Sequence, residues 1–156
     1  MFNVTGTATF LNTTISGSGE NNLWIQNTVS TQLNLTVDGS TFSSTNNTTG
    51  NDGFLLEANG AANIVALIED STFSTNKGDH FQFATDAAAT STTQLTFRNN
   101  TLTNTDTTGV VVVGSSVFIT PSGGADLTFA LTGNNIQNAI DEAFGINIGT
   151  ASTAAL

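Results

Sequence analysis

Asp79 and His80 are adjacent in the sequence, and Lys77 stands two residues before Asp79. An acid beside an imidazole is a pairing that hydrolytic enzymes use for proton transfer. Hydrolysis by paired carboxylates also needs a second acid across a substrate groove. The single Arg of the chain, Arg98, falls on a different predicted strand, so it does not join this group. We therefore interpret this segment as a solvated turn, and we expect the protein not to be an enzyme.

Asp52 and Asp79 form a second candidate pair, because they occupy the same position in two consecutive repeats. If the repeats stack, their carboxylates come within a few ångströms of each other. Ca²⁺ takes six to eight oxygen ligands, so two carboxylates near backbone carbonyls could bind it weakly. The repeat signature of calcium-binding β-rolls is missing, so we expect no dedicated metal centre and no other cofactor. Divalent ions could also screen the net charge of −10 between subunits.

Trp24, Leu55 and Val111 form a candidate surface patch, since each lies between two residues that are predicted to point inward. Side chains alternate between the two faces of a strand, so these three are expected to point outward. An exposed apolar stripe is typical of a lateral contact or a ligand surface, and Trp24 could stack on a sugar ring. The alternative is that a loop, such as the insertion 114–124, covers the stripe. The polar members of the same column are Gln82 and Asn147.

A repeat of five units positions these residues. Each unit has three apolar positions, of which the second follows the first by two residues and the third follows the second by five. The first column is Ala8, Leu35, Ala66, Leu95 and Phe129; the second is Phe10, Val37, Ile68, Phe97 and Leu131; the third is Ile15, Phe42, Phe73, Leu102 and Ile136. Successive members of the third column lie 27 to 34 residues apart, which is too irregular for helical repeats of fixed length.

Two further apolar residues follow each third-column residue after a polar turn. These alternating pairs are Leu23 and Ile25, Phe54 and Leu56, Phe81 and Phe83, Val110 and Val112, and Ile146 and Ile148. Alternation puts both members of a pair on one side of a strand, and the β-branched and Phe-rich composition favours strands. We therefore predict an all-β fold, a β-solenoid of about five coils, in a single domain spanning residues 1–156. Only residues 138–143 are expected to form a short helical turn.

Stacked coils bring equivalent side chains about 4.8 Å apart. We therefore expect amide ladders of Asn100 over Asn134 and of Asn104 over Asn138. In an outward column that begins at Asp38, we also expect Arg98 to pair with Glu69. That exposed contact is worth about 0–1 kcal/mol.

The charge balance excludes several classes of partner. The chain has 12 acidic residues and 2 basic ones, whereas a nucleic-acid binder needs a basic stripe to neutralise phosphates. Anionic membrane surfaces are disfavoured for the same reason, and no apolar run is long enough for a transmembrane helix. The absence of Cys excludes disulfides and thiolate metal sites. An acidic, Cys-free chain rich in Thr and Asn is typical of bacterial surface proteins, so we expect an extracellular or cell-surface location.

The apolar columns and the polar turns between them resemble the right-handed parallel β-helix repeat family, which includes pectin-degrading enzymes, phage tailspikes and large bacterial surface proteins. The resemblance covers essentially the whole chain. Its motif is structural, so it implies a right-handed parallel β-helix and not an activity. The Gly-His-Gly and paired-Asp signatures of polygalacturonases are missing, which places a polysaccharide lyase or hydrolase last among the alternatives.

The ends of the predicted solenoid carry no obvious cap, and an uncapped coil exposes an apolar cross-section and unpaired strand edges. The chain also stops near the phase at which it starts. We therefore predict a structural subunit that assembles head to tail into an extracellular filament or surface fibre. The alternatives are a fragment of a longer surface protein, and an adhesin or polysaccharide-binding module that uses Trp24. The residues expected at the head-to-tail contact are Phe2, Val4, Ala8, Ile146, Ile148 and Leu156.

Overall fold

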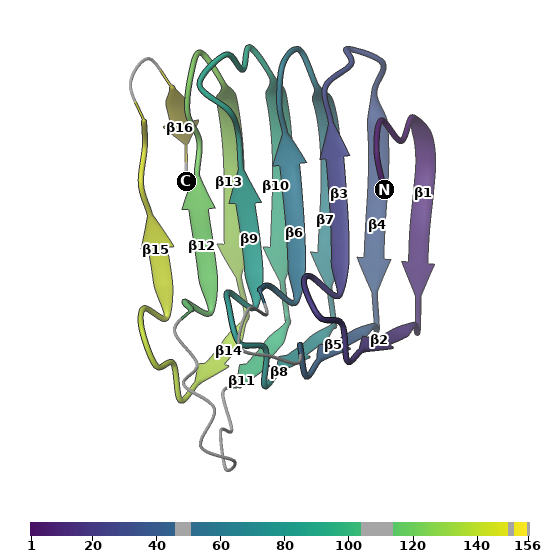
Figure 1. Ribbon diagram of the computed structural model, residues 1–156, viewed down its shortest axis with the longest axis vertical. Helices are drawn as coiled ribbons and strands as arrows, with labels where there is room; N and C mark the ends of the chain where they lie inside the picture. Colours follow the sequence, from purple (N-terminus) through teal and green to yellow (C-terminus); the bar gives the residue numbers. More distant parts are fainter. Residues whose placement is uncertain (46–50, 104–113, 150–151, 156) are drawn as a thin grey trace.

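The computed structural model describes residues 1–45, 51–103, 114–149 and 152–155. These residues form β-strands in three parallel sheets, and none of them forms a helix. The chain passes from one sheet to the next, and each complete round forms one coil of a β-solenoid of about five coils (Figure 1). The predicted fold class is confirmed. Within the described ranges, no helix is long and apolar enough to cross a membrane.

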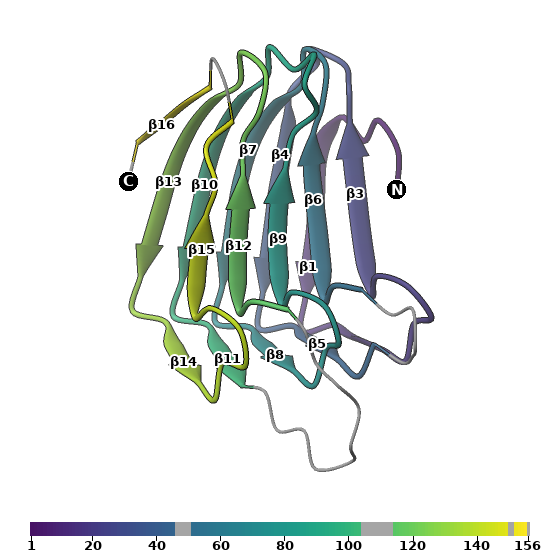
Figure 2. The same cartoon turned by 60° about the vertical axis from the view of Figure 1, so that its left-hand side comes forward.

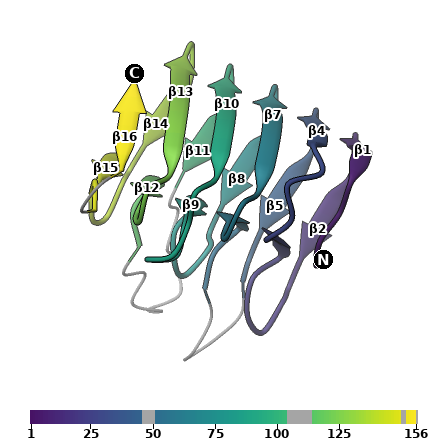
Figure 3. The same cartoon turned by 90° about the horizontal axis from the view of Figure 1, so that it is seen from above.

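Each sheet takes one strand from every coil, and Figure 3 shows the coils as successive loops along one axis. The long sheet consists of β1 (Gly6–Leu11), β4 (Leu33–Asp38), β7 (Asn63–Glu69), β10 (Thr92–Arg98), β13 (Asp126–Thr132) and β16 (Thr153–Ala155). The short sheet consists of β2 (Thr14–Ser16), β5 (Thr41–Ser43), β8 (Thr72–Ser74), β11 (Thr101–Thr103) and β14 (Asn135–Gln137). The return sheet consists of β3 (Leu23–Asn27), β6 (Phe54–Ala58), β9 (Phe81–Ala84), β12 (Val117–Thr120) and β15 (Phe144–Ile146).

The strand register confirms the three predicted apolar columns. Leu35 lies in register between Ala8 of the coil before and Ala66 of the coil after. Phe42 lies in the same way between Ile15 and Phe73. Equivalent residues therefore stack directly on one another along the solenoid axis.

Phenylalanine rings fill the middle of the core, and each of them is fully buried. Phe73 stacks on Phe42 with ring centroids 5.1 Å apart. On its other side it packs against Phe97 at 5.7 Å, and Phe97 in turn stacks on Phe81 at 5.0 Å. Burying one such side chain contributes roughly 1.5–3 kcal/mol, and an aromatic pair adds about 0.5–1.5 kcal/mol. The core is therefore a continuous ring stack that crosses from the short sheet to the return sheet.

A sharp corner joins each strand of the long sheet to the next strand of the short sheet. One residue at this corner adopts the left-handed backbone conformation in all five coils, with φ between 49° and 65°. Glycine adopts this conformation freely, and Asn and Asp tolerate it better than other residues. The residues at this position are Asn12, Gly39, Asp70, Asn99 and Gly133.

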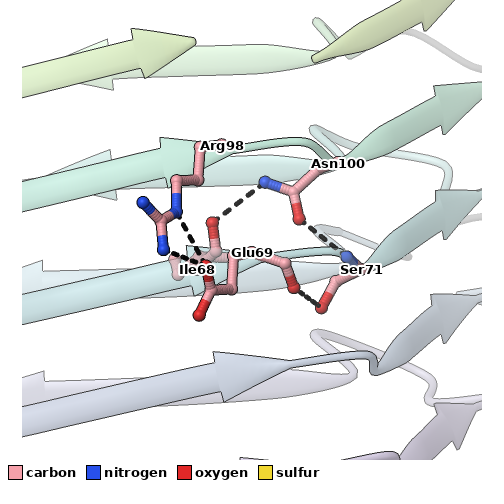
Figure 4. Close-up of polar contacts among 5 residues, drawn as sticks. All are labelled: Ile68, Glu69, Ser71, Arg98 and Asn100. Atoms are coloured by element: carbon pink, nitrogen blue, oxygen red, sulfur yellow. Dashed lines mark hydrogen bonds and ion pairs between the residues drawn. The ribbon is translucent and has the colours of Figure 1, made fainter. Parts of the chain in front are cut away.

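The next corner residue points inward and links neighbouring coils (Figure 4). The Ser71 N–H donates to Asn100 Oδ1 at 2.9 Å, and Asn100 Nδ2 donates to the Ile68 carbonyl oxygen at 3.0 Å. The Asn100 N–H and Nδ2 both donate to Asn134 Oδ1, at 2.8 Å and 3.1 Å. The predicted ladder of Asn100 over Asn134 is therefore confirmed, whereas Asn104 lies outside the described residues.

The return strand of the fourth coil begins later than predicted. Val117 and Ile119 of β12 are in register with Phe81 and Phe83 of β9. They hold the inward positions that the sequence analysis gave to the pair within residues 110–112, which lies outside the described residues. That prediction is wrong because residues 110–112 and 117–119 both carry alternating apolar side chains, and the apolar pattern alone does not choose between them.

The fifth coil differs from the prediction in two places. Phe144 and Ile146 occupy the inward positions of β15, so the predicted pair of Ile146 and Ile148 is displaced by two residues. Residues 138–143 form bends and not the expected helical turn. Asn138 has a φ of 54°, which is incompatible with continuing a right-handed helix.

Candidate functional site

The predicted solvated turn is buried at His80 and partly exposed at Lys77 and Asp79. His80 is 0% exposed, and its ring Nδ1 lies 3.0 Å from Asn76 Nδ2. Burial lowers the pKa of His80 to about 4, so the imidazole is neutral at pH 7. The interpretation of a solvated turn is therefore wrong for His80, and the imidazole offers no solvent-facing base.

Gly53 makes room for this buried polar group. It stands in register with His80 one coil earlier, and a Cβ at Gly53 would lie 2.4 Å from Asn76 Nδ2. Asn76 Nδ2 donates to the Phe42 carbonyl oxygen at 3.2 Å, and its Oδ1 accepts from Asn22 Nδ2 at 3.2 Å. Asn76 thus ties three coils together. The sequence analysis missed this role. A glycine one coil before a histidine could have indicated it, because the missing side chain leaves space for a buried polar group.

A ladder of polar residues runs along the turns that precede the return strands. We call it the acidic corner, and its members are Asn21, Asp52, Asp79, Ser115 and Glu142. The Asp79 N–H donates to Asp52 Oδ1 at 2.9 Å, and the Ser115 N–H donates to Asp79 Oδ1 at 2.7 Å. The Asp52 N–H in turn donates to Asn21 Oδ1 at 2.9 Å, and Ser115 Oγ donates to Glu142 Oε2 at 2.8 Å. The structure therefore brings Asp52 and Asp79 into one column, as the sequence indicated. Sequence reasoning missed Ser115 and Glu142, because their positions depend on the length of the preceding turn.

The two aspartates of the acidic corner are strongly perturbed. Burial raises the pKa of Asp52 to about 6, partly opposed by the hydrogen bond from the Asp79 backbone. Burial, followed by repulsion from Asp52, raises the pKa of Asp79 to about 7. Asp141 and Glu142 add further repulsion at Asp79. Lys77 lies in the same turn but forms no ion pair with either aspartate.

One carboxylate oxygen of each aspartate in the Ca²⁺ hypothesis is engaged by a backbone amide. Oδ1 of both Asp52 and Asp79 already accepts a backbone N–H. In the part of the chain that the structure describes, no group of three or more His, Cys, Asp or Glu residues is placed to hold a metal ion. Ca²⁺ requires six to eight oxygen ligands, so weak binding at Asp52 and Asp79 stays a prediction.

The outer face of the return sheet carries the predicted stripe with one change. Trp24 is in register with Leu55, and Gln82 and Phe118 continue the column into the third and fourth coils. Val111 lies outside the described residues, and Phe118 holds the position predicted for it. Trp24 is 43% exposed, which makes it the most open member of this column among the described residues.

Polar contacts and a glycine fix the two aromatic rings of the stripe. Trp24 Nε1 donates to Glu57 Oε2 at 2.7 Å, and Gln26 Nε2 donates to the same oxygen at 3.0 Å. Phe118 lies against Gly145, where a Cβ would stand 2.7 Å from the Phe118 ring. Gly145 takes the column position that was predicted for Asn147.

The described part of the insertion 114–124 does not cover the stripe. Residues 117–120 form β12, which is itself a strand of the return sheet. In Figure 2, no described segment passes in front of β3, β6, β9 and β12. The outer face of the return sheet is therefore open in the described structure.

The predicted contact residues at the first coil lie in two environments. Phe2 forms an isolated bridge with Gln26 and is 65% exposed. Val4 and Ala8 are half-buried and pack against the core. The first coil thus presents one exposed aromatic side chain beside partly covered core residues.

The last coil shows a similar mixture. Ile146 is half-buried and packs against the core, whereas Ile148 is 49% exposed. Leu156 lies outside the described residues.

The predicted pair of Arg98 and Glu69 is confirmed on the long sheet, with Arg98 Nη2 2.6 Å from Glu69 Oε2 (Figure 4).

Comparison with protein families, curated proteins and solved structures finds no match for this chain.

Proposed function

We propose that this chain is a structural module of an extracellular filament or surface fibre, in which copies of the chain stack end to end. The observation that carries the proposal is the state of the two terminal coils. β1 and β16 are the outermost strands of the long sheet, β2 and β14 those of the short sheet, and β3 and β15 those of the return sheet. The N-terminal segment already occupies part of the outer edge of β3, because Phe2 forms a bridge with Gln26 and the Asn3 N–H donates to the Gln26 carbonyl oxygen. The outer edges of the other five terminal strands pair with no strand among the described residues. An unpaired strand edge is a template for another chain.

The free edge of β1 offers defined backbone groups. The Gly6 and Asn12 N–H groups donate to the β4 side, to Gln32 and Asp38. Successive residues of a strand direct their backbone groups to opposite sides. Thr7 and Thr9 therefore direct their N–H and C=O groups away from β4, toward the position of a further coil.

The apolar cross-section at each end supports the same reading. Eight inward residues of the terminal coils pack against the core but are only half-buried, unlike their fully buried equivalents in the middle coils. Leu23 and Ile25 of β3 and Leu127 and Phe129 of β13 are the buried exceptions. Covering the half-buried residues would remove apolar surface from water, which stabilises an assembly by roughly 25 cal/mol per Å². The half-buried residues are Val4, Ala8, Phe10, Ile15, Leu131, Ile136, Phe144 and Ile146.

A proline at Thr9 tests the proposal. Thr9→Pro removes only an N–H that faces the free edge, and proline is tolerated on edge strands. We expect the unaltered protein to form elongated assemblies in sedimentation and negative-stain electron microscopy, increasingly so as salt screens the charge of −10. Thr9→Pro should remain a folded monomer, and the matched variant Thr9→Val, which keeps the N–H, should assemble. Monodisperse unaltered protein at all ionic strengths would refute the proposal.

The right-handed sense of the coil and membership of the β-helix repeat family belong to this proposal. Crossover connections between parallel strands of one sheet are right-handed in nearly all proteins. The extracellular location rests on the acidic, Cys-free composition. A non-catalytic role is consistent with the burial of His80.

A polysaccharide-binding or adhesin role is the second candidate, because Trp24 is both exposed and held in place by Glu57. A fixed aromatic ring on an open sheet can stack on a sugar without further ordering. Affinity electrophoresis in glycan-containing gels tests this role. Retardation that Trp24→Ala abolishes would support it, and equal mobility in all gels would refute it.

A further inference from the structure

We infer that the acidic corner is a proton-dependent brace, which holds neighbouring coils together most firmly in mildly acidic surroundings and loosens as the surroundings become neutral. The inference goes beyond the proposed structural role, because it assigns a regulating condition to one corner of the solenoid.

The geometry places two carboxylates where their charge is poorly compensated. Asp52 is 7% exposed, and its Oδ1 accepts the N–H of Asp79 from the next coil. A Cβ at Gly78 would lie 2.6 Å from Asp52 Oδ1, which shows how closely the backbone encloses this carboxylate. Asp79 continues the column toward Ser115. A backbone N–H compensates part of a carboxylate charge, but it supplies no full positive charge.

The charged and titratable groups around the corner do not neutralise it. Asp141 and Glu142 face Asp79 from the turn before β15 and are themselves acidic. Glu20, in the turn of the first coil, adds no positive charge. Lys77 and His80 share the turn of Asp79. Lys77 forms no ion pair with either aspartate, and His80 is buried and neutral at pH 7.

The sign of the pH dependence follows from proton counting. The raised pKa values of Asp52 and Asp79, about 6 and 7, mean that the folded chain holds two protons that the unfolded chain releases above about pH 4. The lowered pKa of His80 acts in the opposite direction, since the unfolded chain binds a proton there below about pH 6.5. The folded state therefore keeps a net excess of about one proton. Its folding equilibrium should weaken by up to roughly tenfold per pH unit between about pH 4 and pH 7.

Denaturant unfolding at pH 4.5 and pH 7.5 tests the brace. Asp79→Asn keeps an oxygen for the Ser115 N–H and removes the charge. We expect it to lower the unfolding equilibrium constant at pH 7.5 by roughly 10- to 100-fold and to change it little at pH 4.5. Asp52→Asn should act in the same direction. Asp126→Asn is the matched control, because it removes one exposed carboxylate on the long sheet and should leave the pH dependence unchanged.

Local and ionic measurements separate the brace from other roles. Hydrogen exchange at the Asp79 and Ser115 amides should be slower at pH 4.5 than at pH 7.5 after correction for intrinsic rates, and should lose this difference in Asp79→Asn. The inference is wrong if the unaltered protein is equally stable at both pH values, or if Asp79→Asn destabilises it at pH 7.5. Stabilisation by added Ca²⁺ at pH 7.5 that Asp79→Asn abolishes would show a cation site in place of a proton site.

Discussion

Replacing Asn100 by Ala should test the ladder of inward-pointing corner residues, which includes Ser71, Asn100 and Asn134, more directly than any other single change. Asn100 Oδ1 accepts the N–H of Ser71, and Asn100 Nδ2 donates to the Ile68 carbonyl oxygen (Figure 4). Ser71 and Asn100 are each only 1% exposed. Water therefore has little access to the groups that the substitution would leave without partners.

The magnitude follows mainly from these two contacts, because Asn134 Oδ1, which also loses Asn100 Nδ2, keeps the backbone N–H of residue 100. A buried N–H left without an acceptor costs about 1–3 kcal/mol, and an ordinary intramolecular hydrogen bond contributes about 0.5–1.5 kcal/mol. We therefore expect Asn100→Ala to lower the free energy of unfolding by about 2–4 kcal/mol. For a protein of this size, 1 kcal/mol shifts the Tm by about 2–4 °C, so the Tm should fall by roughly 5–15 °C.

Two further variants make the assay decisive. Asn100→Ser should cost about 1 kcal/mol or less, because Ser71 already holds this position in the preceding coil and accepts the N–H of Ser40. Asn135→Ala removes an exposed amide whose contact is with Gln137, and should change stability by less than about 0.5 kcal/mol. Unfolding in urea, followed by circular dichroism, measures all three. If Asn100→Ala is no less stable than Asn135→Ala, the ladder does not stabilise the solenoid as argued.

Three other substitutions probe the core, the buried polar group and the surface. Phe73→Ala should lower the free energy of unfolding by about 3–5 kcal/mol in urea titrations, because it interrupts the ring stack; a loss below about 1 kcal/mol would contradict the packing described. Gly53→Ala should cost about 1–3 kcal/mol, since the new Cβ would lie 2.4 Å from Asn76 Nδ2 and 2.6 Å from a backbone oxygen. An unchanged Tm would show that the corner can relax. Arg98→Gln should change stability by no more than about 1 kcal/mol, because the Arg98 side chain is 48% exposed in its pair with Glu69; a larger loss in the same titration would contradict this.

The sequence predicted the fold because its strongest signal is apolar and recurs in every coil. The column that contains Phe42 and Phe73 is correct in register, since the spacing between the first three apolar positions is fixed. The return strand is reached through a turn of variable length. In the last two coils the apolar residues also offer more than one alternating pair, within 110–119 and within 144–148. β12 and β15 were therefore misplaced, whereas β3, β6 and β9 were not.

Burial of polar groups was the harder part to predict. Nothing in the alternation of apolar residues separates His80, which is fully buried, from a polar residue in an exposed turn. Its burial depends on Asn76 and on the small residue Gly53 in the neighbouring coil. Asp52 and Asp79 were placed in one column, but their engagement with backbone amides follows from the corner geometry, which the sequence does not specify.

The two ends of the chain lie at opposite ends of the solenoid (Figure 1), and this arrangement determines how the molecule should respond to force. Neighbouring strands of each sheet succeed one another along the axis, so the bonds between coils point along the direction of pull. A force applied at the termini would detach one end coil at a time. Each detachment would release a segment of 27 to 34 residues, or about 90–120 Å of extended chain. Stretched singly, the molecule should therefore lengthen in discrete steps of this size.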